Sequence, residues 1–139
     1  MRIFIIFFTV LLTYSSLFSN ELVWLNNYNN ALLQSKKSNK PLLIYYTMPG
    51  CKACIFMKKD VFTNQEISIF LKENFVLLEL DVKNKDVPEN LRAKVTPTFE
   101  FINFKEQRVA DTIIGGKKAF KFLELIEEAI EELPYRVID

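Results

Sequence analysis

The sequence Met48-Pro49-Gly50-Cys51-Lys52-Ala53-Cys54 holds the only two cysteines of the 139-residue chain. An apolar run, residues 42–46, precedes this stretch, and a lysine-rich segment with helical spacing follows it. The thiolate of a cysteine between a strand and a helix is stabilised by the first N–H groups and the positive end of the helix. A second cysteine one turn later can close a disulfide with it, and such a pair can exchange disulfides with other molecules.

A purely structural disulfide is the simplest alternative, and the size of its loop argues against it. In the chain-entropy model, so small a loop stabilises a protein by about 2 kcal/mol, whereas a loop of about a hundred residues contributes nearly 5 kcal/mol. We therefore favour redox chemistry at Cys51 and Cys54, with a metal site, an inert bridge or two free thiols as the alternatives.

A second apolar run opens the chain. Residues 3–12 are almost entirely apolar and follow the single positive side chain of Arg2, and residues 13–19 are more polar. This pattern is typical of a secretory signal peptide, so we expect a signal over residues 1–19, one domain over residues 20–139 and export of the protein. An uncleaved anchor is the alternative, although a bilayer span needs about 20 apolar residues. An oxidising compartment makes disulfide chemistry a usable activity.

The charge of the chain is balanced. It has 18 basic and 17 acidic residues and no histidine, and removal of residues 1–19 takes away Arg2 and no acid. The sequence contains no basic block and no glycine-rich loop, which argues against nucleic-acid and nucleotide binding. Half of the residues are hydrophobic, enough for a core that does not depend on disulfides.

The remaining pattern predicts alternating helices and strands. Asn26 or Asn27 is available to cap the first helix, and Thr63 is the expected cap of the third, with Glu66 at capping-box spacing. The apolar run 42–47 lacks alternation, as expected of a strand buried on both faces. Together these elements describe a mixed α/β sheet with helices on both faces. The expected helices are 25–37, 51–60, 64–73, a short one within 87–94, and 117–133; the expected strands are 42–47, 75–82, a third ending near 104, and 109–114.

At this point the chain resembles an exported, periplasmic member of the thioredoxin superfamily. The CxxC motif after a buried strand, Thr96-Pro97-Thr98 some forty residues later, a hairpin with its turn predicted at residues 105–107 and Gly115-Gly116 before the last helix match in order, over residues 25–135. The resemblance implies a thioredoxin-like fold with a mixed sheet of four to five strands. It also implies that Thr96-Pro97 is cis and lies against the cysteines, so that a substrate strand can pair at Thr96. A trans proline that only begins an edge strand is the alternative.

The activity that the resemblance implies is that of a thiol-disulfide oxidoreductase acting on protein disulfides in the cell envelope. Cys51 attacks to form a mixed disulfide, and Cys54 resolves it. The redox-active disulfide is the only reactive group needed, so we expect no cofactor. We expect a monomer whose partners are protein thiols and disulfides, with a membrane electron carrier to recycle the pair. We favour a reductase over a disulfide donor.

The chain departs from thioredoxins close to the motif. A buried acid usually lies six residues before the first cysteine, where this chain has Tyr45. Glu79 interrupts the apolar strand and is our candidate to take the proton from Cys54, with Glu100 as second choice. The simpler reading of each is an acid at a solvent-exposed strand end. Lys52 would lower the pKa of Cys51 and make the pair more oxidising, unless it is only a solvated lysine.

Two other classes of function are compatible with the motif. Met48, Cys51, Cys54 and Met57 are spaced three apart, and their soft sulfur ligands suit Cu(I), as in a copper chaperone. Core packing explains Met57 equally well, and the absence of histidine weakens this reading. We therefore assign no metal ligand. A redox-inert binding module that uses the same fold is the third class.

Overall fold

The computed structural model describes the backbone of residues 21–136 and the side chains of residues 21–133. The predicted signal peptide, its cleavage after residue 19 and the alternative membrane anchor lie outside these residues. Within the described part of the chain, no helix combines the length and the hydropathy needed to cross a bilayer.

A mixed four-stranded sheet forms the centre of the molecule, in the order β2-β1-β3-β4. The central strand β1 is parallel to β2 and antiparallel to β3, and β4 is antiparallel to β3. A single parallel bridge from Leu25 to Leu78 covers the outer edge of β2. The predicted mixed sheet is confirmed, and its buried central strand is the apolar run that the sequence indicated. The strands are β1 (Leu42–Thr47), β2 (Val76–Asp81), β3 (Thr98–Ile102) and β4 (Ile113–Ile114).

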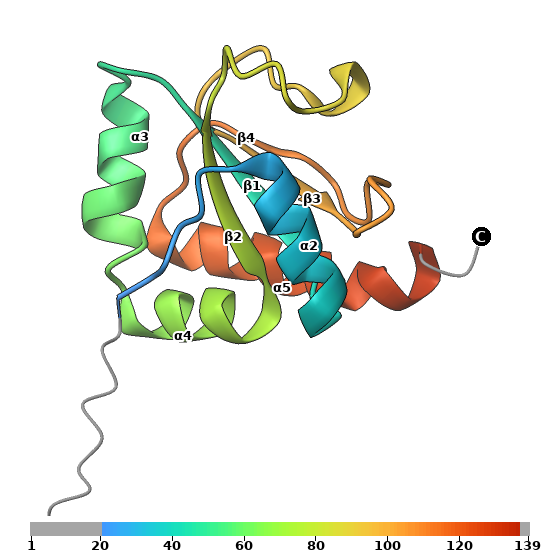
Figure 1. Cartoon of the computed structure of the whole chain (residues 1–139). Coiled ribbons are helices and arrows are strands. Elements are labelled where there is room, and N and C mark those ends of the chain that lie inside the picture. Colours follow the sequence, from blue (N-terminus) through green and yellow to red (C-terminus); the bar gives the residue numbers. More distant parts are fainter. Residues whose placement is uncertain (1–20, 137–139) are drawn as a thin grey trace, which may run out of the picture.

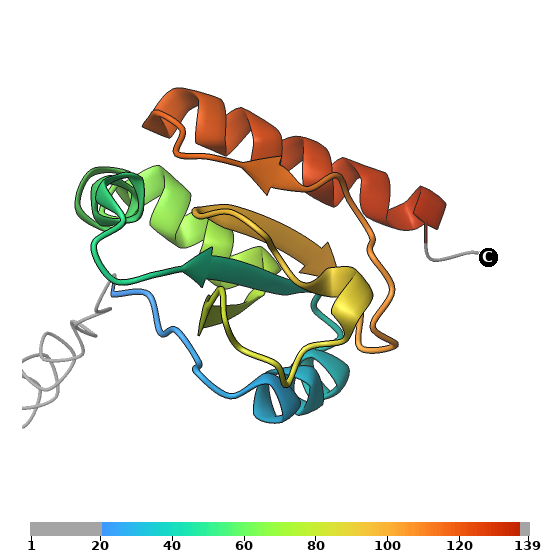
Figure 2. The same ribbon diagram turned by 90° about the horizontal axis from the view of Figure 1, so that it is seen from above.

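Helices cover both faces of this sheet, as predicted. In Figure 2, α2 and α5 lie on opposite sides of the strands, and α3 and α4, seen beside the sheet in Figure 1, pack on the same side as α5. The short 3-10 helix η2 lies in the long connection between β2 and β3. The helices are α2 (Tyr28–Ser38), α3 (Lys52–Phe56), the π-helix η1 (Met57–Val61), α4 (Gln65–Asn74), η2 (Glu89–Leu91) and α5 (Ala119–Arg136).

Asparagine side chains cap two of these helices. Asn27 accepts the N–H of Asn30 at 2.9 Å and begins α2, as one of the two predicted caps. The predicted cap of α4, Thr63, is wrong. Asn64 accepts the N–H of Ile67 at 3.2 Å, and the Thr63 hydroxyl instead donates to the carbonyl of Lys59 at 2.7 Å. Because the hydroxyl of Thr63 is used by the carbonyl of the preceding π-helical turn, the next residue, Asn64, caps α4 instead.

Two predicted elements are shorter or less regular than expected. The helix expected over residues 51–60 is α-helical only to Phe56 and continues as the π-helix η1. The strand expected over residues 109–114 pairs regularly only at Ile113–Ile114, with an isolated bridge between Ile102 and Arg108. In this segment, the side chains of Arg108 and Thr112 donate hydrogen bonds to Glu100, a buried acid on β3, and the regular strand pairing is interrupted.

The two faces of the sheet bury different side chains, because successive residues of a strand point to opposite faces. The face under α3, α4 and α5 carries an aromatic layer in which Tyr45 stacks on Phe99, with ring centroids 5.1 Å apart. Phe122 of α5 lies 4.9 Å from Phe99 in the same layer. The face under α2 buries Tyr46 and mainly aliphatic side chains. The aromatic layer therefore lies on the side of the sheet that carries the CxxC helix.

Candidate active site

A tight turn connects the end of β1 to the cysteines. Gly50 has φ +76°, in the left-handed region that favours glycine, and a Cβ at this position would touch nothing within 4 Å. The N–H of Cys51 donates to the carbonyl of Met48 at 3.3 Å and closes the turn. Cys51 is then the N-cap of α3, at the junction of strand and helix that the sequence predicts.

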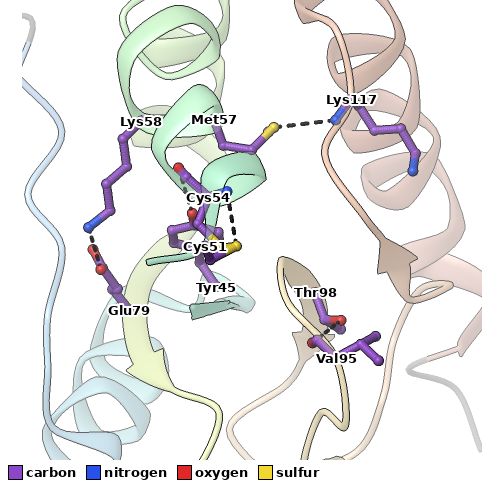
Figure 3. The surroundings of a disulfide bond; sticks show 9 residues. All are labelled: Tyr45, Cys51, Cys54, Met57, Lys58, Glu79, Val95, Thr98 and Lys117. Carbon is purple, nitrogen blue, oxygen red and sulfur yellow. Dashed lines mark hydrogen bonds and ion pairs between the residues drawn. A yellow bond between two sulfur atoms is a disulfide. The ribbon is translucent and has the colours of Figure 1, made fainter. Parts of the chain in front are cut away.

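Cys51 and Cys54 are joined by a disulfide, with their Cα atoms 5.2 Å apart. The N–H of Cys54 donates to Sγ of Cys51 at 3.2 Å, so the first sulfur receives a helix N–H group (Figure 3). Cys54 is 2% exposed, whereas Cys51 is partly exposed. A reagent from solution therefore meets Cys51 first. An N–H donor at this sulfur favours its thiolate once the bond is reduced.

A second segment, residues 95–98, lies across from the cysteines (Figure 3). The Thr96–Pro97 peptide bond is cis. The hydroxyl of Thr98 donates to the carbonyl of Val95 at 2.9 Å, which closes this segment into a turn. Pro97 is buried, Thr96 is partly exposed, and Val95 is 52% exposed.

A third segment, the connection from β4 to α5, packs against both of the others. Its Gly115 donates its N–H to the carbonyl of Pro97 at 2.8 Å. Next to it, a Cβ on Gly116 would lie 3.4 Å from the Cβ of Ala53, so glycine allows this segment to approach α3 closely. The sequence singled out the two glycines but gave no signal for this contact, because Ala53 is 63 residues away.

The same segment explains one of the two methionines near the motif. Met57 is fully buried, and its Sδ accepts the N–H of Lys117 at 3.4 Å. Met48 is exposed at the surface turn before Cys51. Within the described residues, no group of three or more His, Cys, Asp or Glu side chains is placed to hold a metal ion. Met57 therefore has a packing role that needs no metal.

Tyr45 lies directly beneath the disulfide. Its hydroxyl donates to the carbonyl of Cys54 at 3.1 Å. Burial raises the pKa of Tyr45 to about 12, and the negative charge of Glu79 also raises it. At neutral pH this residue is therefore an uncharged hydrogen-bond donor at the position where the family resemblance expects an acid.

Two further aromatic residues surround Tyr45, and sequence reasoning missed both. Trp24, from the segment before α2, lies 5.6 Å from Tyr45 and 5.0 Å from Phe62 between ring centroids. Phe62 meets the edge of Tyr45 at 5.2 Å. These residues come from three parts of the chain that only the tertiary fold brings together, so no local pattern could have identified them.

Glu79 lies on β2 opposite Tyr45 in the register of the sheet, on the same face, as strand alternation predicted. It forms an ion pair with Lys58 of η1 (Figure 3). The side chains are 25% and 48% exposed, so water reaches both members of the pair. The sequence did not indicate Lys58 as a partner, because the two residues are 21 positions apart.

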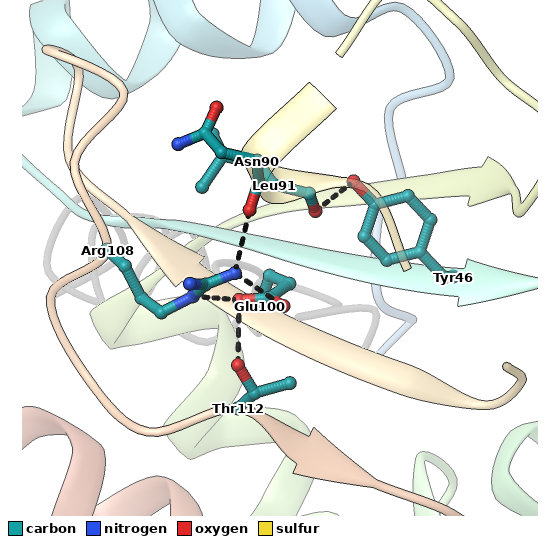
Figure 4. Close-up of polar contacts among 6 residues, drawn as sticks. All are labelled: Tyr46, Asn90, Leu91, Glu100, Arg108 and Thr112. Atoms are coloured by element: carbon teal, nitrogen blue, oxygen red, sulfur yellow. Dashed lines mark hydrogen bonds and ion pairs between the residues drawn. The ribbon is translucent and has the colours of Figure 1, made fainter. Parts of the chain in front are cut away.

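Glu100, the second choice for the proton acceptor, lies on the face of the sheet away from the cysteines. Its carboxylate accepts two hydrogen bonds from Arg108, at 2.6 and 3.0 Å, and one from the hydroxyl of Thr112 at 3.0 Å (Figure 4). These hydrogen bonds raise the pKa of Arg108. The choice of Glu100 is therefore wrong: alternation along β3 turns it toward the face of Tyr46.

Lys52 is the first residue of α3 and is exposed. Among the described residues it has no ion-pair partner. The structure thus brings together five of the residues singled out from the sequence, namely Tyr45, Cys51, Lys52, Cys54 and Glu79, with the cis peptide Thr96–Pro97 across from them.

Comparisons with known proteins agree with this arrangement. A family model described as thioredoxin-like matches residues 23–103. The chain is 34% identical over 91 residues to the anterior gradient protein 2 homolog of Homo sapiens, a match that covers 66% of this chain and 51% of that protein. The chain therefore spans about half the length of the curated relatives it matches.

Solved structures show the same fold. A thioredoxin from Thermus thermophilus superposes with a TM-score of 0.69 at 22% identity, covering 81% of this chain and 89% of that one. A putative disulphide-isomerase from Bacteroides thetaiotaomicron gives the same TM-score at 20% identity, covering 79% and 93% of the two chains. The mixed sheet with helices on both faces is thus a thioredoxin-like fold, as the resemblance implied.

Proposed function

We propose, from the premise that this chain belongs to the thioredoxin-like family, that it is a thiol-disulfide oxidoreductase acting on protein disulfides in the cell envelope. The observation that carries this proposal is the difference between the two sulfurs at the start of α3. Cys51 is accessible and receives a helix N–H group, whereas Cys54 is buried. This division fits one attacking and one resolving sulfur.

In the proposed reaction, the reduced protein transfers two electrons to a substrate disulfide. The Cys51 thiolate attacks one substrate sulfur, the substrate S–S bond breaks, and the departing sulfur takes up a proton. The product is a mixed disulfide at Cys51. Cys54 then loses its proton and attacks Sγ of Cys51, which forms the Cys51–Cys54 bond and releases the second substrate sulfur as a thiol. The same steps in reverse donate a disulfide.

Apolar side chains around the disulfide support a polypeptide substrate. Met48, Val95 and Ile114 are 44%, 52% and 59% exposed, and each belongs to one of the three segments that meet at the cysteines. Large exposed apolar side chains that gather at one place mark an interaction site more often than isolated ones do. We propose that a substrate strand pairs beside Thr96 and rests on this rim with its sulfur at Cys51.

Three other residues complete the proposed site. Tyr45 fixes the carbonyl of Cys54 through its hydrogen bond and thereby tunes the reactivity of the cysteine pair. Lys52 stabilises the Cys51 thiolate. Glu79 accepts the proton of Cys54, supported by its place beside Tyr45 and its contact with solvent. Lys58 holds the Glu79 carboxylate on the disulfide face in this proposal.

The location and direction belong to the same proposal. The apolar leader supports export, with residues 1–19 as the signal peptide and residues 20–139 as the domain, and we further propose that the protein is periplasmic and monomeric. In an oxidising compartment a reductase needs a source of electrons, and a membrane carrier that presents a dithiol can supply them. We therefore propose reduction of envelope protein disulfides, with no cofactor besides the Cys51–Cys54 pair.

Two single variants test the chemistry. Cys51→Ser is expected to abolish disulfide exchange with a model peptide disulfide, and Cys54→Ser to accumulate mixed disulfides that a non-reducing gel resolves. Exchange that survives in Cys51→Ser, or a Cys54→Ser variant that traps nothing, would contradict the assignment of the two roles.

The reduction potential decides the direction. Equilibration of the pair in glutathione buffers, read by mass after thiol trapping, is expected to give a value near the about −270 mV of reducing pairs. A value near the about −120 mV of strong oxidants would make the protein a disulfide donor and leave the exchange chemistry intact. A pair that does not equilibrate would instead point to a redox-inert binding module.

A further inference from the structure

Charge is distributed unevenly over this chain. The three segments that meet at the disulfide, residues 48–59, 92–98 and 114–121, contain eight basic residues and no acid. The whole chain has 18 basic and 17 acidic residues, so the remainder has ten basic residues against 17 acids. A nearly neutral protein thus concentrates its positive charge in the segments around its reactive sulfur.

Contacts between these segments bring them together around the cysteines. The N–H of Gly115 donates to the carbonyl of Pro97, Gly116 packs on Ala53 of α3, and the N–H of Lys117 donates to Sδ of Met57 in η1. Figure 3 shows the turn at Val95 on the side of the cysteines and the segment at Lys117 beside Met57. The three basic segments therefore lie next to one another at the cysteines, and we call their lysines the lysine border.

Most of these cations have no acid to neutralise them. Three of the eight basic side chains are engaged elsewhere: Lys58 pairs with Glu79, Lys121 pairs with Glu124, and Arg92 donates to two backbone carbonyls. Lys117 caps the carbonyls of Ile114 and Gly115. Within the described part of the chain, no carboxylate pairs with the other four, Lys52, Lys59, Lys94 and Lys118, which are all exposed.

The acids lie elsewhere. From residue 124 to residue 132, α5 carries five glutamates and no base, and α4 adds Glu66 and Glu73. The other exposed lysines of note, Lys36 and Lys37, lie in the last turn of α2, where they face the negative end of that helix. Lys59 lies in the last turn of η1 and shares this local explanation, whereas Lys52, Lys94 and Lys118 lie outside the last turn of any helix and lack it.

We propose that the lysine border around Cys51 selects disulfide substrates whose cysteines are flanked by acidic residues. This inference rests on the proposed function, since it names the substrate class of the same site. Opposite charges steer a diffusing partner and raise the rate of encounter by about ten- to a thousandfold at low ionic strength. Salt screens exposed charges over about 10 Å at 0.1 M, so the selection weakens as salt increases.

The test is the second-order rate of disulfide exchange between the reduced protein and three peptides that form the same disulfide. The peptides differ only in the residues flanking the cysteine, which are acidic, neutral or basic. At 10 mM salt we expect the acidic peptide to react about tenfold faster than the neutral one, and the basic peptide to react slowest. At 0.5 M salt the three rates are expected to converge.

Charge-removal variants assign the effect to this surface. In Lys94→Gln/Lys118→Gln the ratio of acidic to neutral rates at low salt is expected to fall at least threefold. The matched control, Lys36→Gln/Lys37→Gln, removes the same charge at the end of α2 and is expected to keep the ratio of the natural protein. Equal rates for the three peptides, or a ratio that falls equally in both variants, would overturn the inference. Lack of reaction with every peptide would overturn the proposed function itself.

Discussion

Two adjacent tyrosines of β1, Tyr45 and Tyr46, belong to two similar polar clusters on opposite faces of the sheet. On the disulfide face, the hydroxyl of Tyr45 donates to the carbonyl of Cys54 at 3.1 Å. On the other face, the hydroxyl of Tyr46 donates to the carbonyl of Leu91 at 3.0 Å (Figure 4). Each tyrosine thus joins the central strand to a segment that borders the site, α3 in the first case and the connection before the cis peptide in the second.

Each tyrosine also has an acid on a neighbouring strand, and the two acids are held differently. Glu79 has one ion pair, with Lys58, and its side chain is 25% exposed. Glu100 is 5% exposed and accepts three hydrogen bonds, two from Arg108 and one from Thr112. A buried carboxylate needs such a set of donors, whereas a solvent-exposed one does not.

This difference suggests that the Glu100 cluster and the Glu79 cluster have different roles, one in stability and one in reactivity. Arg108 also donates to the carbonyl of Asn90, so the Glu100 cluster anchors the connection that carries the cis peptide (Figure 4). Its carboxylate is buried and its oxygens already accept three hydrogen bonds, so solvent and substrate reach it far less than they reach Glu79. Glu79 faces the disulfide side, in contact with water. We therefore expect the Glu100 cluster to stabilise the fold and the Glu79 cluster to act in disulfide exchange.

The largest effect should come from removing the cation on the far face. Arg108→Met leaves the buried carboxylate of Glu100 with only the Thr112 hydroxyl, and loss of one partner of a buried pair costs about 3 kcal/mol. Chemical denaturation of the oxidised protein measures this loss. Lys58→Met on the disulfide face is the matched control. It is expected to lower the free energy of unfolding by less than about 1 kcal/mol, because the side chains of Lys58 and Glu79 both contact water. Equal losses in the two variants would remove the distinction between the clusters.

Alkaline pH tests the burial of the tyrosine on the disulfide face. The folded-state pKa of Tyr45, about 12, lies above its ordinary value of 10.0, so the unfolded chain loses this proton first. The stability associated with the neutral hydroxyl is fully present below pH 10 and is lost as the pH rises from about 10 to 12, by on the order of 2 kcal/mol. Burial raises the pKa of Tyr28 and Tyr46 in the same direction.

Denaturation curves between pH 9 and 11 check this expectation. The free energy of unfolding should fall with pH above 10 in the natural protein, and less steeply in Tyr45→Phe, which has one proton fewer to lose. A Tyr45→Phe variant with the same slope would show that the hydroxyl titrates alike in the folded and unfolded chains, which is incompatible with its burial beneath the disulfide.

Removal of each tyrosine hydroxyl at pH 7 should give a smaller effect. Tyr45→Phe and Tyr46→Phe each lose one buried hydrogen bond, so each is expected to reduce stability by about 1 kcal/mol. Only Tyr45→Phe is expected to change the rate of disulfide exchange, by a few-fold, because its partner is the carbonyl of Cys54. Stopped-flow measurement of exchange with a peptide disulfide separates the two variants. An equal change of rate in both would assign the effect to general loosening of the sheet.

The two acids also show how far the sequence could lead. Strand alternation placed Glu79 on the face of Tyr45, and the apolar run 42–47 identified the buried central strand, since both depend on local periodicity. Alternation alone does not tell which face of the sheet Glu100 occupies. That also requires the pairing register between β3 and β1. That register depends on pairing between segments more than 50 residues apart, which no local pattern records.

The parts of the site that the sequence missed depend on tertiary packing in the same way. Lys58 meets Glu79 only because the π-helix follows α3 along the outer strand. The cap of α4 moved from Thr63 to Asn64 for the same reason, since residues of either type can cap a helix and the preceding turn decides between them. The motif residues, by contrast, could be located because their spacing itself defines a turn of helix.

The smallest structural effect, and the most specific one, is expected for Glu79→Gln. Glutamine keeps the shape of the side chain and removes its charge at a site that water reaches, so stability should change by less than about 0.5 kcal/mol. If Glu79 accepts the proton of Cys54, the rate at which Cys54 resolves a mixed disulfide should fall and its dependence on pH should shift to higher values, because no carboxylate is left to take the proton. Single-turnover release of a Cys51-bound peptide, followed from pH 5 to 9, measures this step.

Glu66→Gln, on the exposed surface of α4, is the matched control and should retain the natural pH profile. A natural profile in Glu79→Gln as well would leave the Lys58–Glu79 pair a surface ion pair, and only the hydroxyl of Tyr45 would then distinguish the disulfide face from the far face.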